Sequence, residues 1–220
     1  MTIWWLLWAV LSFILLGATV WSLAILQQQK KTWSEFAKRR GLLFKKGKFS
    51  APCEVEGTAD GMHISLFSAT QQKEDARKNR QLTVLQIKYP KSFVDSFAAG
   101  TGEMLPFLNS LGSISPHPLE DKNWDKTNHH IYSRNKEAVK KYLTEERVTL
   151  LNKILKVGNS DNVIVMEPEE VVFRFETSNP LTDLSQLDAM VSKLVAAMKK
   201  LEPDEKEIKS FSKLYVSAES

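Results

Sequence analysis

The side chains that could bind a metal ion or act as nucleophiles are few in this chain. It has four histidines, His63, His117, His129 and His130, and a single cysteine, Cys53. His129 and His130 are adjacent, so on a strand their rings would point to opposite faces and could not both reach one metal ion. Metal ligands usually show close local spacing, which is missing here. The pattern favours surface or strand histidines, although the fold could still gather Cys53 and some of the histidines into one site.

Other catalytic and phosphate-binding patterns are equally weak. Glu54 and Glu56 follow Cys53, and their charges favour the protonated thiol, so a buried, inert cysteine is the simpler interpretation. The fragment Gly100-Thr101-Gly102 lacks the third glycine of a dinucleotide fingerprint and the lysine of a P-loop. No C-x-x-C, H-E-x-x-H, EF-hand or G-x-S-x-G pattern occurs in the sequence. We therefore expect no metal and no cofactor, and the balance is against an enzyme.

The strongest pattern is an apolar N-terminal run. Residues 3–26 carry no formal charge, and a helix of that length spans about 36 Å, enough to cross a hydrocarbon core of about 30 Å. Backbone groups in lipid must pair within their own segment, so the run must be helical. Tryptophans near its two ends resemble the aromatic belts of membrane interfaces: Trp4, Trp5, Trp8 and Trp21. We predict a transmembrane anchor over residues 1–29.

A cleaved signal peptide is the main alternative to this anchor. Such a peptide has a basic start, an apolar core of about 7–15 residues and a cleavage site of small residues. Here no Lys or Arg precedes the run, and the run is longer than such a core. Leu23, Ala24 and Ile25 make a poor cleavage site. A retained anchor therefore fits better.

A basic juxtamembrane segment over residues 30–48 follows the anchor. It contains one acidic residue, Glu35, and eight basic ones: Lys30, Lys31, Lys38, Arg39, Arg40, Lys45, Lys46 and Lys48. The whole chain carries a net charge of +4, so this segment supplies the positive charge and the remainder is mildly acidic. A nucleic-acid-binding module would need a basic face on the folded domain itself, so we expect no nucleic-acid partner.

The same segment predicts the orientation of the chain. No Lys or Arg lies on the N-terminal side of the apolar run. The positive-inside rule then places the N-terminus outside and the C-terminal domain in the cytoplasm, with the anchor in a bacterial inner membrane. Beside a membrane, the eight basic residues are also predicted to contact anionic lipids. An alternative that stays open is that they only set the orientation.

Residues 49–220 alternate between strand and helix patterns and predict one soluble domain. Strands are expected in two hairpins and two single segments: Cys53–Thr58 with Met62–Phe67 around Asp60-Gly61, Asn162–Met166 with Val171–Thr177, Gln81–Tyr89 and His129–Ser133. The best helix starts after Asp183 and carries a continuous apolar stripe as far as Leu201. This order predicts an α+β fold, an antiparallel sheet with helices packed on one face.

Several other elements are less clearly marked. Short helices are expected over Phe93–Ala99 and Met104–Leu111, a longer one between Asn135 and Gly158, and a weak one over Glu205–Val216. Thr32 and Glu35 resemble a capping box that would begin a new helix, although that helix could equally continue the anchor without a break.

Three segments carry a family resemblance: the basic W-x-x-F-A-K-R-R-G of residues 33–41, the G-x-x-D-G-x-x-I hairpin of residues 57–64, and residues 132–147 after a strand. With the anchor, this arrangement resembles uncharacterised bacterial single-pass membrane proteins with a cytoplasmic α+β domain. The resemblance covers most of the soluble part and implies a fold and a location. It implies no activity and no site residues.

An anchor joined to a folded domain without catalytic spacing predicts a non-enzymatic accessory or scaffold subunit of a larger membrane complex. Ala18 and Ser22 are spaced i, i+4 and would allow close packing against an integral membrane partner. Membrane lipids are the other expected partner, and the sequence leaves the oligomeric state open. The alternative is an enzyme or small-ligand-binding domain whose site is assembled only in the fold, from His63, His117 or His130 together with perturbed carboxylates.

Overall fold

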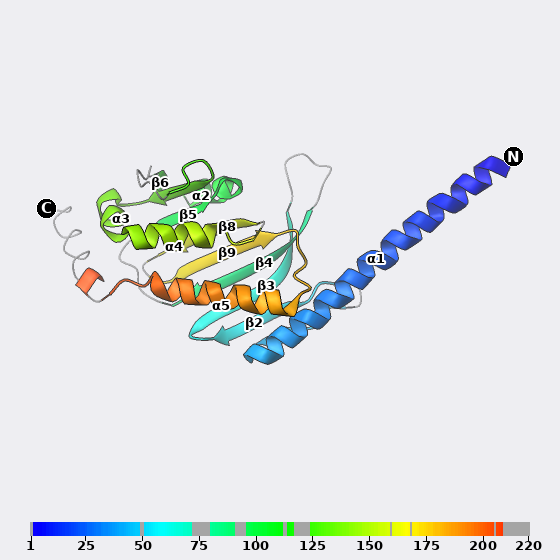
Figure 1. The fold of residues 1–220 in the computed structure, drawn as a ribbon, viewed down its shortest axis with the longest axis horizontal. Helices are drawn as coiled ribbons and strands as arrows, with labels where there is room; N and C mark the ends of the chain where they lie inside the picture. The colour runs from blue at the N-terminus through cyan, green and yellow to red at the C-terminus, as the bar shows by residue number, and fades with distance from the viewer. Residues whose placement is uncertain are drawn as a thin grey trace.

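The structure, a computed structural model, describes residues 2–48, 51–71, 80–90, 96–111, 114–116, 124–158, 160–167, 169–204 and 206–208. A long N-terminal helix is followed by an antiparallel nine-stranded sheet and several shorter helices (Figure 1). The fold is therefore α+β, as the sequence predicts. The predicted helix over Glu205–Val216 falls largely outside the described residues.

The sheet pairs strands from both halves of the domain. Its order is β1-β2-β3-β4-β9-β8-β5-β7-β6, and every neighbouring pair is antiparallel. The strands are β1 Leu43–Lys45, β2 Glu54–Ala59, β3 Met62–Gln71, β4 Arg80–Tyr89, β5 Phe97–Thr101, β6 Ser115–Pro116, β7 His129–Ser133, β8 Asp161–Met166 and β9 Val171–Thr177. The pairing of β4 with β9 joins the N-terminal meander to the C-terminal hairpin, so residues 43–177 form one sheet.

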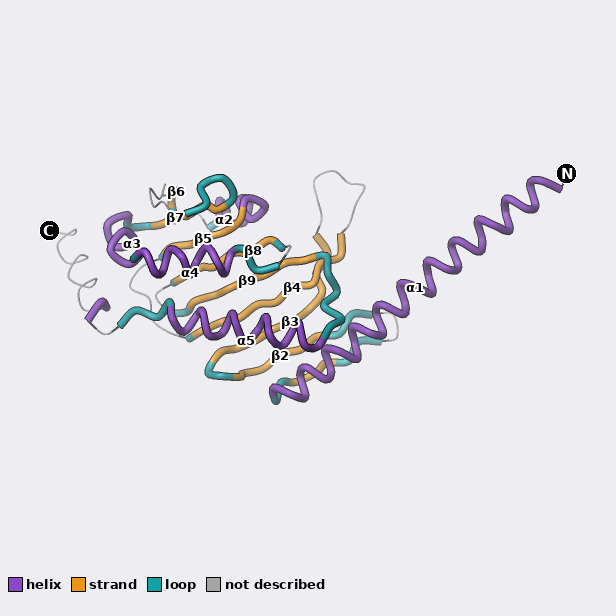
Figure 2. The backbone as a smooth tube through the Cα atoms, in the orientation of Figure 1, coloured by secondary structure: helices purple, strands orange, loops and turns teal. Residues whose placement is uncertain are grey.

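Helices cover the two faces of the sheet unequally. The helices are α1 Thr2–Arg40, the 3₁₀ turn η1 Gly102–Met104, α2 Leu105–Ser110, α3 Lys136–Tyr142, α4 Glu145–Leu155 and α5 Leu184–Lys200. The main hydrophobic core lies between one sheet face and α5, α4, α3 and the end of α1, as the helices drawn beside the strands in Figure 2 illustrate. On the opposite face, which we call the open face, the described residues form a small second core under α2.

Local sequence signals explain the best-predicted elements. Asp60 and Gly61 both have positive φ, 56° and 79°, as a two-residue primed turn requires, and β2 pairs with β3 on either side of them. Asp183 caps α5 by accepting a hydrogen bond from the Gln186 amide. Thr144 caps α4 in the same way and separates it from α3. The predicted turn at Asp60-Gly61 and the predicted start of α5 are confirmed, while the single helix expected between Asn135 and Gly158 is two helices, α3 and α4.

One prediction of local structure is wrong. The helix expected over Phe93–Ala99 is replaced by β5, since Phe97–Thr101 lies between β8 and β7, while residues 91–95 lie outside the described part. β5 is covered on both faces, and a Cβ on Gly100 would lie only 3.2 Å from Leu108 Cδ1. Small residues therefore mark close packing here. Of the two alternatives left open at Thr32, the continuous helix is observed, because α1 runs through this residue without interruption.

Candidate functional site

The last turns of the anchor helix belong to the hydrophobic core of the domain. Trp33 and Phe36 are fully buried, and Ala37 is 1% exposed. All three belong to the same core cluster as β2, β3 and α5. Gly41, with φ of 68°, ends the helix, and the Leu42 amide donates to the Ala37 carbonyl at 2.8 Å. The chain then turns back into β1. The helix that could cross a membrane is thus continuous with one that is packed inside the domain.

Polar contacts fix the same part of α1. The guanidinium of Arg40 donates to Asp188 Oδ1 at 2.7 Å and to the Asp188 carbonyl at 3.0 Å. It also contacts Ser192 of α5 and lies 5.6 Å from the centre of the Phe36 ring. Thr32 Oγ1 donates to the Thr182 carbonyl at 2.8 Å. These bonds join α1 to the beginning of α5, some 150 residues away in the chain.

The contacts of α1 define a membrane-facing end of the domain. Lys30 Nζ donates to the Lys48 carbonyl at 2.7 Å, so residues 30 and 48 lie at one level. From Lys30 to Arg40 the helix rises about 15 Å, and the extended run from Leu43 back to Lys48 covers about 16 Å. The apolar run ends at Leu26, about 6 Å along the helix from Lys30. With residues 3–26 in a bilayer, this end of the domain lies at headgroup level.

The structure divides the eight basic residues by environment. Four of them contact protein groups: Lys30 binds the Lys48 carbonyl, Arg39 and Arg40 pair with Asp188, and Lys45 contacts Glu54 and Glu56. Lys31, Lys46 and Lys48 are exposed at the membrane-facing end. Lys38 and Arg39 are exposed further along α1, about 12–14 Å beyond Lys30. The sequence alone could not show which of these basic residues are paired, because several of their partners lie far away in the chain.

The open face of the sheet has two grooves at its membrane-facing end. The first, which we call the α2 groove, lies between α2 with η1 and the β3–β4 hairpin and has a volume of about 400 Å³. Its apolar lining residues are Ala69, Leu82, Met104, Pro106 and Phe107, and its charged ones are Glu103, Arg174 and Glu176. The second groove, of similar volume, lies beside the β1–β2 connection, and Lys45, Lys46, Cys53 and Phe67 line it. Sequence reasoning missed both grooves, since their walls come from distant segments.

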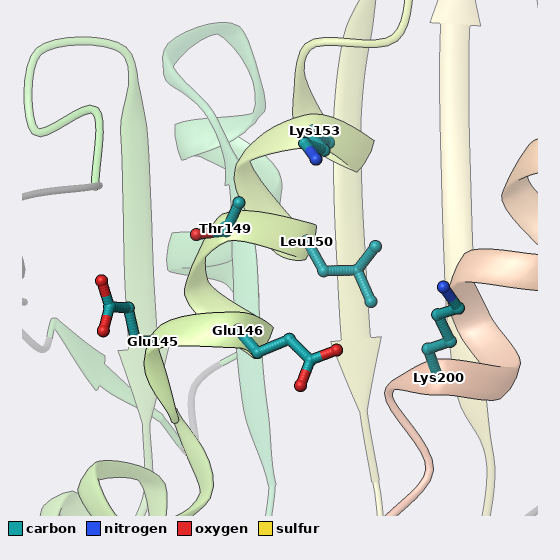
Figure 3. A pocket seen from close by; sticks show the side chains of 6 residues that line it. All are labelled: Glu145, Glu146, Thr149, Leu150, Lys153 and Lys200. Atoms are coloured by element: carbon teal, nitrogen blue, oxygen red, sulfur yellow. The ribbon is translucent and has the colours of Figure 1, made fainter.

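A third groove lies between α4 and α5 on the covered side of the sheet (Figure 3). Leu150 forms its floor, and its rim is polar, with four charged residues and one threonine: Glu145, Glu146, Lys153, Lys200 and Thr149. Figure 3 shows Glu146 and Lys200 extending toward the gap from opposite helices. The groove has charges of both signs, and no histidine or cysteine is among its lining residues.

The histidines do not converge on one site. His63 lies on the open face of β3, 3.4 Å from a Glu56 oxygen. His129 is buried beneath the sheet, while His130 follows it on the opposite face. His117 lies outside the described residues. Among the described residues, no cluster of three metal-binding side chains occurs. The arrangement gives no support to the alternative of a ligand site built from these histidines.

Cys53 is buried, as expected, at 2% exposure. Burial raises the pKa of its thiol, and the nearby Lys30 opposes this shift only weakly. The charges of Glu54 and Glu56 predicted an inert thiol, but the main cause of the raised pKa of Cys53 is its removal from water. A thiol of this kind is a poor nucleophile at neutral pH.

His129 predicts a pH dependence of stability. Its Nδ1 lies 2.7 Å from Asn152 Oδ1, and its ring meets the edge of Trp124 at 5.5 Å. Burial lowers the pKa of His129 below 6.5, with smaller opposing effects from Asn152 and Asp125 and repulsion from Lys156 and His130. The unfolded chain therefore takes up a proton that the folded chain resists. Stability is full above about pH 6.5 and should fall below it, by at most about 1.4 kcal/mol per pH unit.

Chemical denaturation of the full chain in detergent micelles at pH 7.5 and pH 5.0 measures this effect. His129→Gln should reduce the difference in the free energy of unfolding between the two pH values. Carboxylates with lowered pKa, such as Asp125 at about 2, contribute only below about pH 4. If the His129 variant showed the same difference in stability between pH 7.5 and pH 5.0 as the wild type, His129 would not be the source of the pH dependence.

No protein-family model matches the sequence, and a search of curated proteins gives no match. A solved structure that the chain resembles is the crystal structure of the mycobacterial trehalose monomycolate transport factor A. The two chains are 13% identical, the likeness covers 80% of this chain and 96% of the other, and the TM-score is 0.44. A likeness at this level supports no statement about what this chain binds.

Proposed function

We propose that this protein is a non-enzymatic accessory or scaffold subunit of a larger membrane complex, anchored in a bacterial inner membrane by α1. The observation that carries the proposal is the continuity of α1. One helix of 39 residues is apolar and exposed over its N-terminal part and buried in the domain core at Trp33 and Phe36. The domain is mounted on its anchor without a linker.

A rigid connection between the membrane helix and the domain favours a protein that holds a partner in a fixed position. An enzyme that acts on soluble substrates gains nothing from a fixed orientation to the bilayer and can be tethered by a flexible linker. A subunit that holds a partner must present the same surface at the same height and angle. The burial of Trp33 and the bonds of Arg40 to α5 provide that constraint. In this proposal the N-terminus lies outside and the domain faces the cytoplasm.

Anionic lipids are the second partner in this proposal, and three residues carry the contact: Lys31, Lys46 and Lys48. Basic residues near an anionic surface contribute about 1 kcal/mol each. In nanodiscs, phosphatidylglycerol should protect the amides of residues 46–48 from hydrogen exchange more than phosphatidylcholine does. Changing the three lysines to glutamine should remove this difference. The same change at Lys136, Lys140 and Lys153, distant in the chain from α1, should leave it intact; a difference that persists in the first variant rules out the contact.

The membrane helix offers the surface for an integral membrane partner. Ala18 and Ser22 lie one turn apart, and the Ser22 hydroxyl donates to the Ala18 carbonyl at 2.9 Å, so the hydroxyl is satisfied inside the helix. Small side chains on one face let another helix approach closely. This face is exposed.

Extraction of the native protein in mild detergent tests the proposal. The tagged chain should co-purify with a membrane partner, and the double change Ala18→Leu and Ser22→Leu should reduce the recovered partner severalfold. Ser12→Leu is the control, because it enlarges a small residue about 100° around the helix from the middle of the Ala18–Ser22 face. Recovery of free monomer alone, under conditions that preserve other membrane complexes, would exclude a scaffold.

A further inference from the structure

The α2 groove combines an apolar lining with exposure. Leu82 and Met104 are buried at its floor, while Phe107 on its wall is 40% exposed. Among the described residues outside α1, only Leu43 and Phe107 are large hydrophobic side chains with this much exposure. A monomeric soluble domain rarely leaves such a groove uncovered without a use for it.

Strand pairing places this groove near the membrane. Lys45 pairs with Glu54, which lies opposite Phe67, and Phe67 pairs with Val84. This row of paired residues lies about 10 Å farther from the membrane than Lys48, since Lys45 is three extended residues away from Lys48. Ala69 and Leu82, which pair with each other, lie two residues, or about 7 Å, nearer the membrane. In Figure 1 the free ends of β3 and β4 lie on the side toward which the N-terminal half of α1 extends.

Charges at the groove do not oppose an apolar occupant. Arg174 Nε donates to Glu176 Oε1 at 2.6 Å, so the pair at one wall is neutralised internally. The Arg174 guanidinium also lies 6.0 Å from the centre of the Phe67 ring. The third charged lining residue, Glu103, is exposed to water. A hydrocarbon chain could therefore lie on Leu82 and Met104 while the Glu103 carboxylate stays hydrated.

We propose that the α2 groove binds one acyl chain of a membrane phospholipid, drawn from the leaflet that faces the domain. The inference rests on the proposed anchoring, which brings the groove to headgroup level. Phospholipid is the occupant because the groove lies beside a bilayer, and only a short displacement separates a chain in that leaflet from the apolar lining. The bound lipid would strengthen the attachment of the open sheet face to the membrane surface.

Photolabelling of the full chain in nanodiscs tests this inference. The discs contain phosphatidylethanolamine and phosphatidylglycerol with a trace of phosphatidylcholine whose acyl chain carries a diazirine. After irradiation and digestion, adducts should map to residues 3–26 of α1 and also to residues 80–84 and 103–108. Ala69→Phe fills the groove and should remove the second set of adducts while keeping the first. Thr58→Phe is the control. It places a phenylalanine on the same face of the sheet, but on β2 beside the start of β3 and away from the groove, and it should keep both sets of adducts.

A second variant covers the case in which Ala69→Phe disturbs the fold. Phe107→Gln changes an exposed wall residue and should also reduce labelling of residues 80–84. Labelled α1 beside unlabelled groove segments would overturn the lipid groove and leave the anchoring intact. Groove adducts that persist in both variants would also overturn it. An unlabelled α1 would overturn the anchoring together with the groove.

Discussion

Replacing Trp33 with alanine should lower the free energy of unfolding by about 3 kcal/mol, at the lower end of the range for a buried tryptophan. Trp33 is fully buried and is among the largest side chains of the main core. Its Nε1 has no hydrogen-bond partner among the described residues, so the substitution also removes an unsatisfied donor and recovers part of the cost. The predicted result is a shift of the thermal midpoint by about 6–12 °C for a domain of this size.

Thermal unfolding of the full chain in detergent measures this shift. Trp21→Ala is the matched control, because Trp21 lies on the same helix but is 70% exposed in the apolar part. It should leave the midpoint unchanged. Equal midpoints for wild type and Trp33→Ala would mean that α1 does not pack in the core.

Replacing Arg40 with alanine should cost about 2 kcal/mol. The side chain of Arg40 is only 11% exposed, and its bonds to Asp188 are charge-assisted. Such bonds contribute about 1.5–3 kcal/mol, and their loss leaves the Asp188 carboxylate without its closest partner. The lost stability should come from weaker packing between α1 and α5, the two helices that Arg40 joins.

Arg39→Ala provides an internal control for this prediction. Arg39 reaches the same Asp188 at 3.7 Å, but its side chain is 56% exposed, and exposed ion pairs contribute about 0–1 kcal/mol. In denaturant titrations, Arg40→Ala should therefore lower the free energy of unfolding clearly more than Arg39→Ala does. Equal losses would show that position 40 acts only through surface charge.

Elements with strong local signals were predictable from the sequence. The charge-free run of residues 3–26, the turn at Asp60-Gly61 and the Asp183 cap each determine structure through nearby residues. The α+β class followed because alternating strand patterns and amphipathic helices leave few ways to bury their apolar faces. The continuity of α1 remained one of two open alternatives.

Features that depend on distant partners were not predictable. Phe93–Ala99 has the local pattern of a helix, but Phe97–Thr101 is a strand because β8 and β7 pair with both of its edges. Arg40 looked like one more member of a basic stretch, but its partner lies 148 residues away. The α2 groove draws on residues near 70, 105 and 174, which no local pattern connects.

The distance between the membrane helix and the domain tests the central claim most directly. Spin labels at Phe13→Cys in α1 and Lys193→Cys in α5, in a Cys53→Ala background, can be measured by pulsed electron spin resonance in nanodiscs. The docked helix predicts one narrow distance distribution, which broadens in the Trp33→Ala variant. A broad distribution in the unaltered background would show that the domain swings freely on its anchor, and would contradict the account.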